Sequence, residues 1–483
     1  MGREEQIVNE RKKKIEELRK LGINPYPYKF DKKHNTKDCL NSKFGTKIRT
    51  AGRIMTKRDL GKISFAFLQD QSGKIQIVLQ DKKTPKDKET FFKKYLDSGD
   101  FVGIEGKIIK TKTGQKSILV KNIELISKSI LPLPEKWHGL KDEEEKYRKR
   151  YLDILINQET KELFIKKAEF WKTMREFLTK RGFLEVETPV LENSVGGAAA
   201  IPFKTHHNAL DIDVYLRISM GELWQKRLII AGFEKIFEMG RQFRNEGMDI
   251  EHLQDYTQME FYWAYADYKD GMKLVEELYK ELAKKILGTL KFKTHGHSID
   301  LRKKWEIYDY EKIIKEKIKI NVYSATKNQI IDKLRELKIE FDSSVDKWRL
   351  VDLLWKYCRK QISGPGFLIG QPVELSPLAK RSQKDSRKVE QFQVILAGSE
   401  VGNGYSELND PFDQEERFER QTKLKEMGDN ETQSHDKDFV EALKYGMPPT
   451  CGFGVSERLF SYLIDKPIRE CVIFPLMKPE DKK

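Results

Sequence analysis

Short apolar runs separated by Gly, Asp and Lys dominate residues 46–126, and their spacing predicts β-strands. A charged stretch that suits a helix, DKETFFKKYLDS, falls between the third run and the fourth. Five strands with a helix after the third predict a small closed Greek-key barrel, the OB-fold. The five runs read KIRTAGRIMTKRD, KISFAFLQD, KIQIVLQD, DFVGIEGKIIKTKTG and KSILVKNIELIS.

Barrels of this kind bind single-stranded nucleic acid by stacking bases on aromatic side chains within a cationic groove. Arg58, Lys62, Phe65 and Gln76 lie on or beside the central strands, where such contacts form. Phe65 also stands close to Phe67, and the pattern equally allows it to be a core residue. The sequence leaves both interpretations of Phe65 open.

The N-terminal segment, residues 1–44, precedes the barrel domain, which we expect over 45–130. Its residues 3–21 predict a basic helix with a thin apolar stripe, and the Gly and Pro residues of LGINPYPY end it. A cationic helix beside a nucleic-acid module can contact phosphates. A solvated charged face explains the same pattern.

A Pro-rich stretch, LPLPEKWHG, begins a linker that we expect over 131–155. Helical and strand runs then alternate over 156–483, which predicts one large domain that is either α/β or α+β. The Lys-rich part of this domain, residues 289–360, is expected to be a mostly helical insertion.

Length and composition limit the class of protein. A chain of 483 residues suits two or three domains. Its net charge of +15 favours a polyanionic partner such as nucleic acid, although a Lys-rich surface alone also explains it. The four cysteines have no CxxC or zinc-finger spacing, and no run has the character of a signal peptide or a membrane span. We therefore expect free thiols, a cytoplasmic location and no membrane partner.

The most informative stretch is residues 235–268, which predicts a strand, a long polar loop and a second strand. Side chains alternate between the two faces of a strand, so one face of the second strand offers a carboxylate and two phenols. Antiparallel pairing would bring Arg244 near that face, where it can clamp a phosphate or a carboxylate. A surface hairpin with ordinary salt bridges is equally compatible with the pattern. The face carries Tyr256, Gln258, Glu260 and Tyr262.

Two more stretches carry candidate chemistry. Glu400, Asn403 and Glu407 surround a Gly-rich turn, and clustered carboxylates attract Mg²⁺, an ammonium group or both. An acidic loop in solvent is the alternative. Further along, PPTCGFGVSERLF places two glycines before a helix with Arg458 in its first turn. These glycines allow a planar ligand to approach and Arg458 to reach a phosphate, whereas an isolated GxG with a surface arginine is common.

In chain order, three stretches resemble the signature motifs of class II aminoacyl-tRNA synthetases. RGFLEVETPVL, with Pro189, resembles the first motif, which builds the dimer interface. FRNEG through YTQMEFY resembles the second, and GFGVSERL resembles the third. Other stretches are similar to the lysyl-tRNA synthetase family in particular: GGAAAIPFKTHHNALDID, LRISMGELWQKRL, ELSPLAKR, EVGNGYSELND and YGMPPTCGFG. The barrel segment resembles that family's anticodon-binding domain.

The resemblance implies an α+β chain in which the OB-fold barrel precedes a catalytic antiparallel sheet flanked by helices. It implies ATP-dependent activation of L-lysine to lysyl-adenylate and transfer of lysine to the 3′ end of tRNA(Lys). ATP and Mg²⁺ would be required, and the enzyme would be a homodimer. In the barrel, Arg58, Phe65 and Gln76 match the positions that grip the anticodon.

The resemblance also assigns roles around ATP. Arg244 and Arg458 would be the catalytic residues: Arg244 would hold the α-phosphate and the lysine carboxylate, and Arg458 would cover adenine or bind the γ-phosphate. The other residues with implied ATP roles are Glu246 and His252 at the ATP end, Tyr256 stacked on adenine, and Glu400 on Mg²⁺.

For the amino acid, the resemblance implies a pocket of acidic and polar groups. The α-amino group of lysine would lie near Glu222, Glu260 and the Gly197 carbonyl. The ε-ammonium would reach Glu407 and Tyr262, and Asn403 would lie near the lysine carboxylate. Three carboxylates suit a substrate with two ammonium groups. An aspartate pocket, in contrast, would need a cation where Glu407 stands.

The sequence departs from the family pattern in informative places. The position seven residues before Glu400, usually acidic, carries Gln393, whose carboxamide oxygen can ligate Mg²⁺ with less charge, so the number of metal ions is left open. The loop reads HLQDY without the usual Asn-Pro-Glu, and SMGEL has one residue more than the usual form.

Two rival hypotheses stay open. The chain could be a paralogue that lysylates a protein, or an RNA-binding protein with an inactive catalytic domain.

Overall fold

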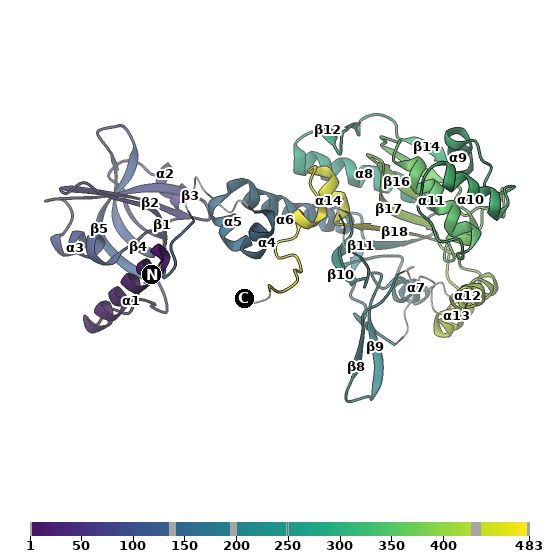
Figure 1. Cartoon of the computed structure of the whole chain (residues 1–483), viewed down its shortest axis with the longest axis horizontal. Coiled ribbons are helices and arrows are strands. Elements are labelled where there is room, and N and C mark those ends of the chain that lie inside the picture. Colours follow the sequence, from purple (N-terminus) through teal and green to yellow (C-terminus); the bar gives the residue numbers. More distant parts are fainter. Residues whose placement is uncertain are drawn as a thin grey trace. The chain divides into compact units, whose positions relative to one another are not determined.

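A computed structural model describes residues 2–134, 142–193, 200–247, 249, 251–426 and 436–480. The chain forms two compact units, Met1–Ile156 and Asn157–Lys483, which are drawn together in Figure 1. Each unit has its own hydrophobic core.

The first unit is built around a closed barrel with the strand order β1-β2-β3-β5-β4, which confirms the OB-fold prediction. Alternate residues of the strands point inward, so Ala66 and Leu68 are buried while Phe65 and Phe67 point outward. The elements are α1 (Arg3–Lys20), α2 (Thr36–Asn41), β1 (Lys47–Asp59), β2 (Ile63–Asp70), β3 (Gly73–Gln80), α3 (Lys86–Tyr95), β4 (Phe101–Lys110), β5 (Lys116–Ser127), α4 (Glu143–Arg148) and α5 (Arg150–Ile156).

Part of the expected linker therefore forms two short helices, α4 and α5. Asp142 caps α4 by accepting a hydrogen bond from the Glu144 backbone N–H, and three glutamates occupy its first turn. Negative charge at a helix N-terminus is stabilising, so the acidic run favours a helix here. Residues 135–141 of the expected linker lie outside the described residues.

The second unit contains an eight-stranded sheet in the order β14-β15-β16-β17-β18-β11-β10-β6. Its central strand pairs are antiparallel, and only the outer pairs β14–β15 and β10–β6 are parallel. The strands of this unit are β6 (Leu184–Glu185), β7 (Leu191–Glu192), β8 (Lys204–His207), β9 (Ile212–Leu216), β10 (Lys235–Phe243), β11 (Asp255–Ala264), β12 (Lys291–Thr294), β13 (His297–Asp300), β14 (Glu306–Asp309), β15 (Gly366–Ile369), β16 (Gln391–Leu396), β17 (Ser399–Ser406) and β18 (Thr450–Ser456).

Helices cover one face of this sheet and leave a cavity on the other. Met259 and Phe261 of β11 share a core with Leu274, Val275 and Leu278 of α8. The alternate residues of β11 consequently face the opposite side of the sheet. The helices are α6 (Gln158–Thr179), α7 (Glu222–Ile230), α8 (Tyr268–Leu287), α9 (Tyr310–Ile318), α10 (Lys327–Glu336), α11 (Lys347–Arg359), η1 (Val373–Leu375), α12 (Pro411–Glu426), α13 (Lys437–Lys444), α14 (Arg458–Leu463) and η2 (Ile468–Cys471).

The stretch 289–360 differs from the expected helical insertion at its beginning. Residues 291–300 form a hairpin, β12–β13, whose turn residues His295 and Gly296 both have positive φ. Strand β14 then joins the edge of the large sheet, and helices α9, α10 and α11 form a separate core beyond it. Lysines alternate with apolar or partly buried residues along β12, so the high charge obscured a period of two.

Candidate functional site

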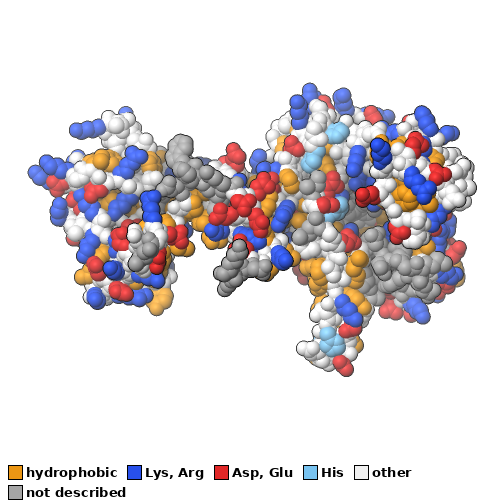
Figure 2. All heavy atoms as spheres, in the orientation of Figure 1, with side chains coloured by type: hydrophobic (Ala, Val, Ile, Leu, Met, Phe, Trp, Pro, Cys, Tyr) orange, Lys and Arg blue, Asp and Glu red, His pale blue; other side chains and the backbone are white. Residues whose placement is uncertain are grey.

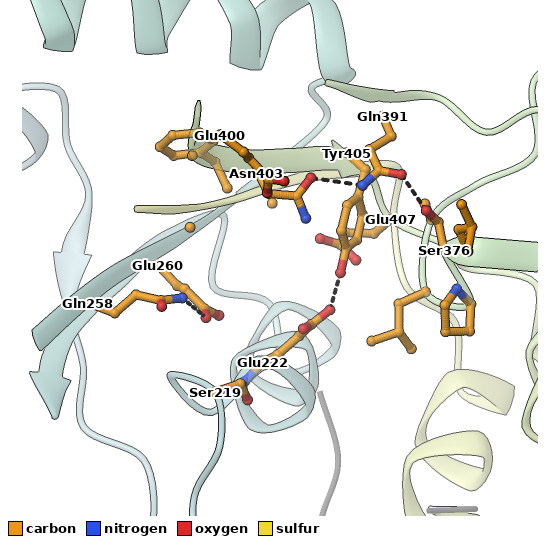
Figure 3. A pocket seen from close by; sticks show the side chains of 18 of the residues that line it. Ser219, Glu222, Gln258, Glu260, Ser376, Gln391, Glu400, Asn403, Tyr405 and Glu407 are labelled. Carbon is orange, nitrogen blue, oxygen red and sulfur yellow. Dashed lines mark hydrogen bonds between the residues drawn. The ribbon is translucent and has the colours of Figure 1, made fainter. Parts of the chain in front are cut away.

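A cavity of about 490 Å³ lies on the face of the large sheet opposite α8. Most of the side chains proposed for the site line this cavity, including the four that share one face of β11. Figure 3 shows several of them from close by. The proposed residues that line the cavity are Glu222, Arg244, Tyr256, Gln258, Glu260, Tyr262, Glu400, Asn403, Glu407 and Arg458.

Strand pairing explains why distant segments meet here. Strand β11 lies between β10 and β18, with Glu260 opposite Glu238 on one side and opposite Gly454 on the other. Strand β17 pairs with the other edge of β18, with Asn403 opposite Gly454. The second and third motif-like stretches and the Gly-rich acidic stretch therefore occupy neighbouring strands.

One end of the cavity is strongly acidic. Glu222 begins α7, Glu260 lies on β11, and Glu407 follows β17, yet all three carboxylates point toward a common space (Figure 3). Glu260 and Glu407 are buried, with 6 % and 1 % of their surfaces exposed. Burial, together with the charge of Glu222, raises the pKa of Glu260 to about 7. Burial raises the pKa of Glu407 to about 8 despite the opposing effect of Lys226.

Hydrogen bonds hold Glu260 and Glu222 in place. Glu260 accepts bonds from Gln258 Nε2 at 2.6 Å, Tyr262 Oη at 3.2 Å and the Met220 N–H at 3.2 Å. Tyr405 Oη donates to Glu222. These bonds leave the acids ordered before any ligand binds, which reduces the entropy that binding must overcome.

The glycines of GFG make room for neighbouring side chains of the pocket. A Cβ atom on Gly452 would overlap Glu407 Oε1 and lie 2.8 Å from the Tyr262 ring. A Cβ atom on Gly454 would lie 3.0 Å from Gln258 Nε2. The missing side chains therefore make room for Glu407, Tyr262 and Gln258, and the close approach of a planar ligand stays a prediction.

The other end of the cavity carries two arginines. Arg244 follows β10, donates from Nε to the Ile218 carbonyl at 3.3 Å, and lies 5.8 Å from the centre of the Tyr256 ring. Arg458 donates to the carbonyl oxygens of Glu251 at 3.3 Å and Glu400 at 3.2 Å. Backbone carbonyls fix both side chains and leave guanidinium N–H groups for an anionic ligand. A site with acids at one end and arginines at the other suits a ligand with ammonium groups and phosphates.

Several proposed residues lie away from the cavity lining. Glu246 is exposed and accepts a hydrogen bond from the Ile201 N–H at 3.3 Å. His252 is exposed, and its Nδ1 lies 2.8 Å from Asp249 Oδ2. Their placement at the ATP end stays a prediction. Gly197 lies outside the described residues.

The possible metal ligands are Glu400 and Gln393. Glu400 lines the cavity 3.8 Å from an Arg359 nitrogen. Gln393 lies on β16, and its buried Oε1 has no hydrogen-bond partner among the described residues. The described part of the chain contains no group of three or more His, Cys, Asp or Glu side chains that could hold a metal ion. Mg²⁺ usually needs only one or two protein carboxylates when substrate phosphates complete its shell, so Glu400 fits it. Gln393 does not line the cavity, and its role as a second ligand stays a prediction.

Sequence reasoning missed four residues of the site. Ser376 donates to Gln391 Oε1 at 2.5 Å, and Gln391 Nε2 donates to Asn403 Oδ1 at 2.8 Å, which orients the Asn403 amide. Tyr405 shares the alternation of Asn403 and Glu407 along β17, so the period of the strand could have revealed it. Lys226, the fourth, is buried beside Glu222 and Glu407; its spacing of four residues from Glu222 on a helix could have indicated the first contact, but no sequence signal indicates the second.

In the barrel, the proposed anticodon residues share an outward surface. Arg58 lies opposite Phe65 on β1 and β2, and Gln76 of β3 lies opposite Phe67. Arg58 is exposed, Phe65 is half-buried outside the core, and Gln76 accepts a hydrogen bond from Ser117 at 2.7 Å. The core interpretation of Phe65 is therefore wrong. Figure 2 shows Lys and Arg side chains spread over the surface of this unit.

Comparisons with known proteins match both units of the chain. The family model described as tRNA synthetases class II (D, K and N) matches residues 142–478, and the OB-fold nucleic acid binding domain matches residues 48–126. A protein named lysine–tRNA ligase from Thermosipho africanus is 45 % identical over 486 residues, which cover 98 % of this chain and 96 % of the relative. Similar proteins of the same name from Fervidobacterium nodosum and Thermotoga maritima are 44 % and 43 % identical; the alignments cover 97 % and 98 % of this chain and 93 % and 96 % of the relatives.

Proposed function

The chain belongs to the class II tRNA synthetases of the D, K and N group, and on that basis we propose that it is a lysine–tRNA ligase. It activates L-lysine with ATP to lysyl-adenylate and then transfers lysine to the 3′ end of tRNA(Lys). The observation that carries the substrate assignment is the buried acidic cluster of Glu222, Glu260 and Glu407. An amino acid with a neutral side chain brings only its α-ammonium group and would leave the negative charge of this buried cluster partly uncompensated, which is costly.

The amino acid binds with both ammonium groups at the acidic end of the cavity. Its α-ammonium lies near Glu222 and Glu260, and its ε-ammonium lies between Glu407 and Tyr262. Asn403, oriented through Gln391, lies near the lysine carboxylate. Gly197 contributes a backbone carbonyl to the α-amino site by resemblance alone.

ATP occupies the arginine end. Adenine stacks on Tyr256, and Arg458 covers its other face or binds the γ-phosphate. Glu246 and His252 lie at the outer end of the nucleotide. Arg244 binds the α-phosphate and the lysine carboxylate together, which brings the reacting atoms close.

The reaction needs no nucleophilic side chain. A carboxylate oxygen of lysine attacks the α-phosphorus in line, the bond to the bridging oxygen breaks, and pyrophosphate leaves. A terminal ribose hydroxyl of the tRNA then attacks the adenylate carbonyl, and AMP leaves. Arg244 and Arg458 stabilise the charge that develops on the phosphate oxygens. Glu400, with Gln393 as a second ligand, would hold Mg²⁺, which would supply further neutralisation of phosphate charge.

The tRNA anticodon binds the outward surface of the barrel. Arg58 contacts the phosphate backbone, Phe65 stacks on a base and Gln76 bonds to a base edge. The net charge of +15 favours the polyanion as well.

A second copy of the chain covers the first motif-like stretch, RGFLEVETPVL. Leu184, Val190 and Leu191 are 50 %, 42 % and 48 % exposed, which is unusual for a group of large apolar residues close in sequence. We place the enzyme in the cytoplasm, because all four cysteines are buried free thiols. No helix in the described part of the chain has the length and apolar character to span a membrane.

The test is the exchange of labelled pyrophosphate into ATP, measured with each of the twenty amino acids. We expect exchange with lysine and little with the others. Exchange with a different amino acid, or with none, would overturn the assignment. Charging of a tRNA(Lys) transcript then separates this function from lysylation of a protein, and it requires the barrel.

A further inference from the structure

A buried lysine, Lys226, contacts the acidic cluster formed by Glu222, Glu260 and Glu407. Lys226 lies one turn after Glu222 on α7, is 1 % exposed, and is not among the residues that line the cavity. Its Nζ lies 2.8 Å from Glu222 Oε1 and 2.6 Å from Glu407 Oε2. The ammonium group therefore joins two carboxylates that come from different elements of the fold.

The surroundings of Lys226 keep it charged. The rings of Tyr405 and Phe439 lie 5.6 Å and 5.8 Å from Nζ, and such rings attract a cation. Burial alone disfavours the ammonium form, but Glu222 and Glu407 together raise the pKa of Lys226 above its ordinary value. An uncompensated charge in this position would be very costly, so the pairing must persist in the folded protein.

At the acidic end of the cavity, the charges of the protein and of a bound lysine balance only when Lys226 is included. When a lysine is bound and the three carboxylates are ionised, Glu222, Glu260 and Glu407 carry three negative charges, and Lys226 reduces the total to two. The two ammonium groups of a bound lysine neutralise those two charges. Its carboxylate faces Arg244 at the other end of the cavity.

We propose that Lys226 is a positioning residue for substrate selection: it is a built-in counter-ion that fixes the charge of the pocket at the value that a diamino acid neutralises. The inference rests on the proposed lysine-activating function. Lys226 does not contact the substrate. It acts by favouring the ionised form of Glu407 and by holding Glu222 Oε1 and Glu407 Oε2 in ion pairs on its own side of the cluster.

Loss of the Lys226 charge has a definite consequence. Three buried carboxylates without a counter-ion repel one another, and one of them would take up a proton. A proton on Glu407 removes the charge that the ε-ammonium group of lysine needs. Lysine recognition should therefore weaken, while ATP, bound at the arginine end, should be affected much less.

The test is a Lys226→Ala variant assayed by lysine-dependent pyrophosphate exchange. We expect the KM for lysine to rise on the order of 100-fold, the size typical of breaking a buried ion pair, with little change in the KM for ATP. Ethylammonium added to the assay should enter the space left by the side chain and lower the KM for lysine by about tenfold. n-Propanol, a neutral molecule of similar size, should not.

Lys226→Met is the matched control, because it keeps the side-chain volume and the packing against Tyr405 and Phe439 without the charge. It should raise the KM for lysine as Lys226→Ala does, but ethylammonium should not rescue it. It also carries the test if the alanine variant does not fold, as judged by thermal unfolding. Wild-type enzyme with ethylammonium measures direct competition for the pocket.

Three results would overturn the inference: a KM for lysine that Lys226→Met leaves unchanged, equal losses for lysine and ATP, or equal rescue of Lys226→Ala by ethylammonium and n-propanol. Any of them would make Lys226 a purely structural link between α7 and β17. If the wild-type enzyme shows no exchange with lysine, the proposed function itself fails, and that result is distinguishable from the other three.

Discussion

Glu407→Gln tests the electrostatic match on which the substrate assignment depends. The side chain is 1 % exposed, so the carboxylate interacts with the lysine ε-ammonium in a site with little screening by water. The substitution keeps the shape of the side chain and removes its charge. Lys226 retains Glu222 at 2.8 Å, so the fold keeps one of its two ion pairs at this position.

Breaking a buried charge pair costs roughly 3–5 kcal/mol. Since Glu222 and Glu260 remain and glutamine still offers a carbonyl oxygen, we expect the lower end, about 3 kcal/mol. At about 1.4 kcal/mol per decade, kcat/KM for lysine should fall on the order of 100-fold. Discrimination against norleucine, which lacks the ε-ammonium, should weaken by a similar factor.

The assay is pyrophosphate exchange with lysine or norleucine as the varied substrate. Glu441→Gln, which removes an exposed acid on α13, is the matched control and should behave as the wild type. A Glu407→Gln enzyme within about tenfold of the wild type in kcat/KM for lysine, a loss under about 1.4 kcal/mol, would refute the reasoning.

Further predictions concern pH, tRNA and metal. The pKa values of Glu407 and Glu260 are raised to about 8 and about 7, so as the pH falls through this range the carboxylates gain protons and lose their attraction for ammonium groups. The KM for lysine should therefore rise between about pH 8.5 and pH 6.5, and a KM that is flat over this range would contradict the assignment. Phe65→Ala should lower the charging of tRNA(Lys) by about 1–3 kcal/mol in kcat/KM for tRNA, with pyrophosphate exchange unchanged, because the lost stacking concerns only the anticodon; an equal loss in both assays would contradict it. Gln393→Glu should lower the Mg²⁺ concentration that gives half-maximal exchange, since it adds charge to the proposed metal site beside Glu400; a higher Mg²⁺ requirement would show that Gln393 is not a ligand.

Local patterns predicted a large part of this molecule. The period of two along the strands identified the barrel, and the same period on β11 placed Tyr256, Gln258, Glu260 and Tyr262 on one face. The alternation of side chains along a strand depends only on backbone geometry, so it can be recognised in the sequence without knowing which strands pair with it. In 291–309 three strands of four residues each were missed, because so short a run shows little periodicity and β12 also carries two lysines.

Sequence by itself therefore determined the strands of the barrel, the face of β11 and the residue types that suit a doubly cationic amino acid and a nucleotide. Only the tertiary structure decided which charged side chains form ion pairs with one another. The pairing of β17 with β18 brings Glu407 beside Gly452, and the packing of α7 places Lys226 between Glu222 and Glu407. Electrostatic energy depends on distance in space and on burial, and residues 226 and 407 are far apart in the chain, so no periodicity encodes their contact.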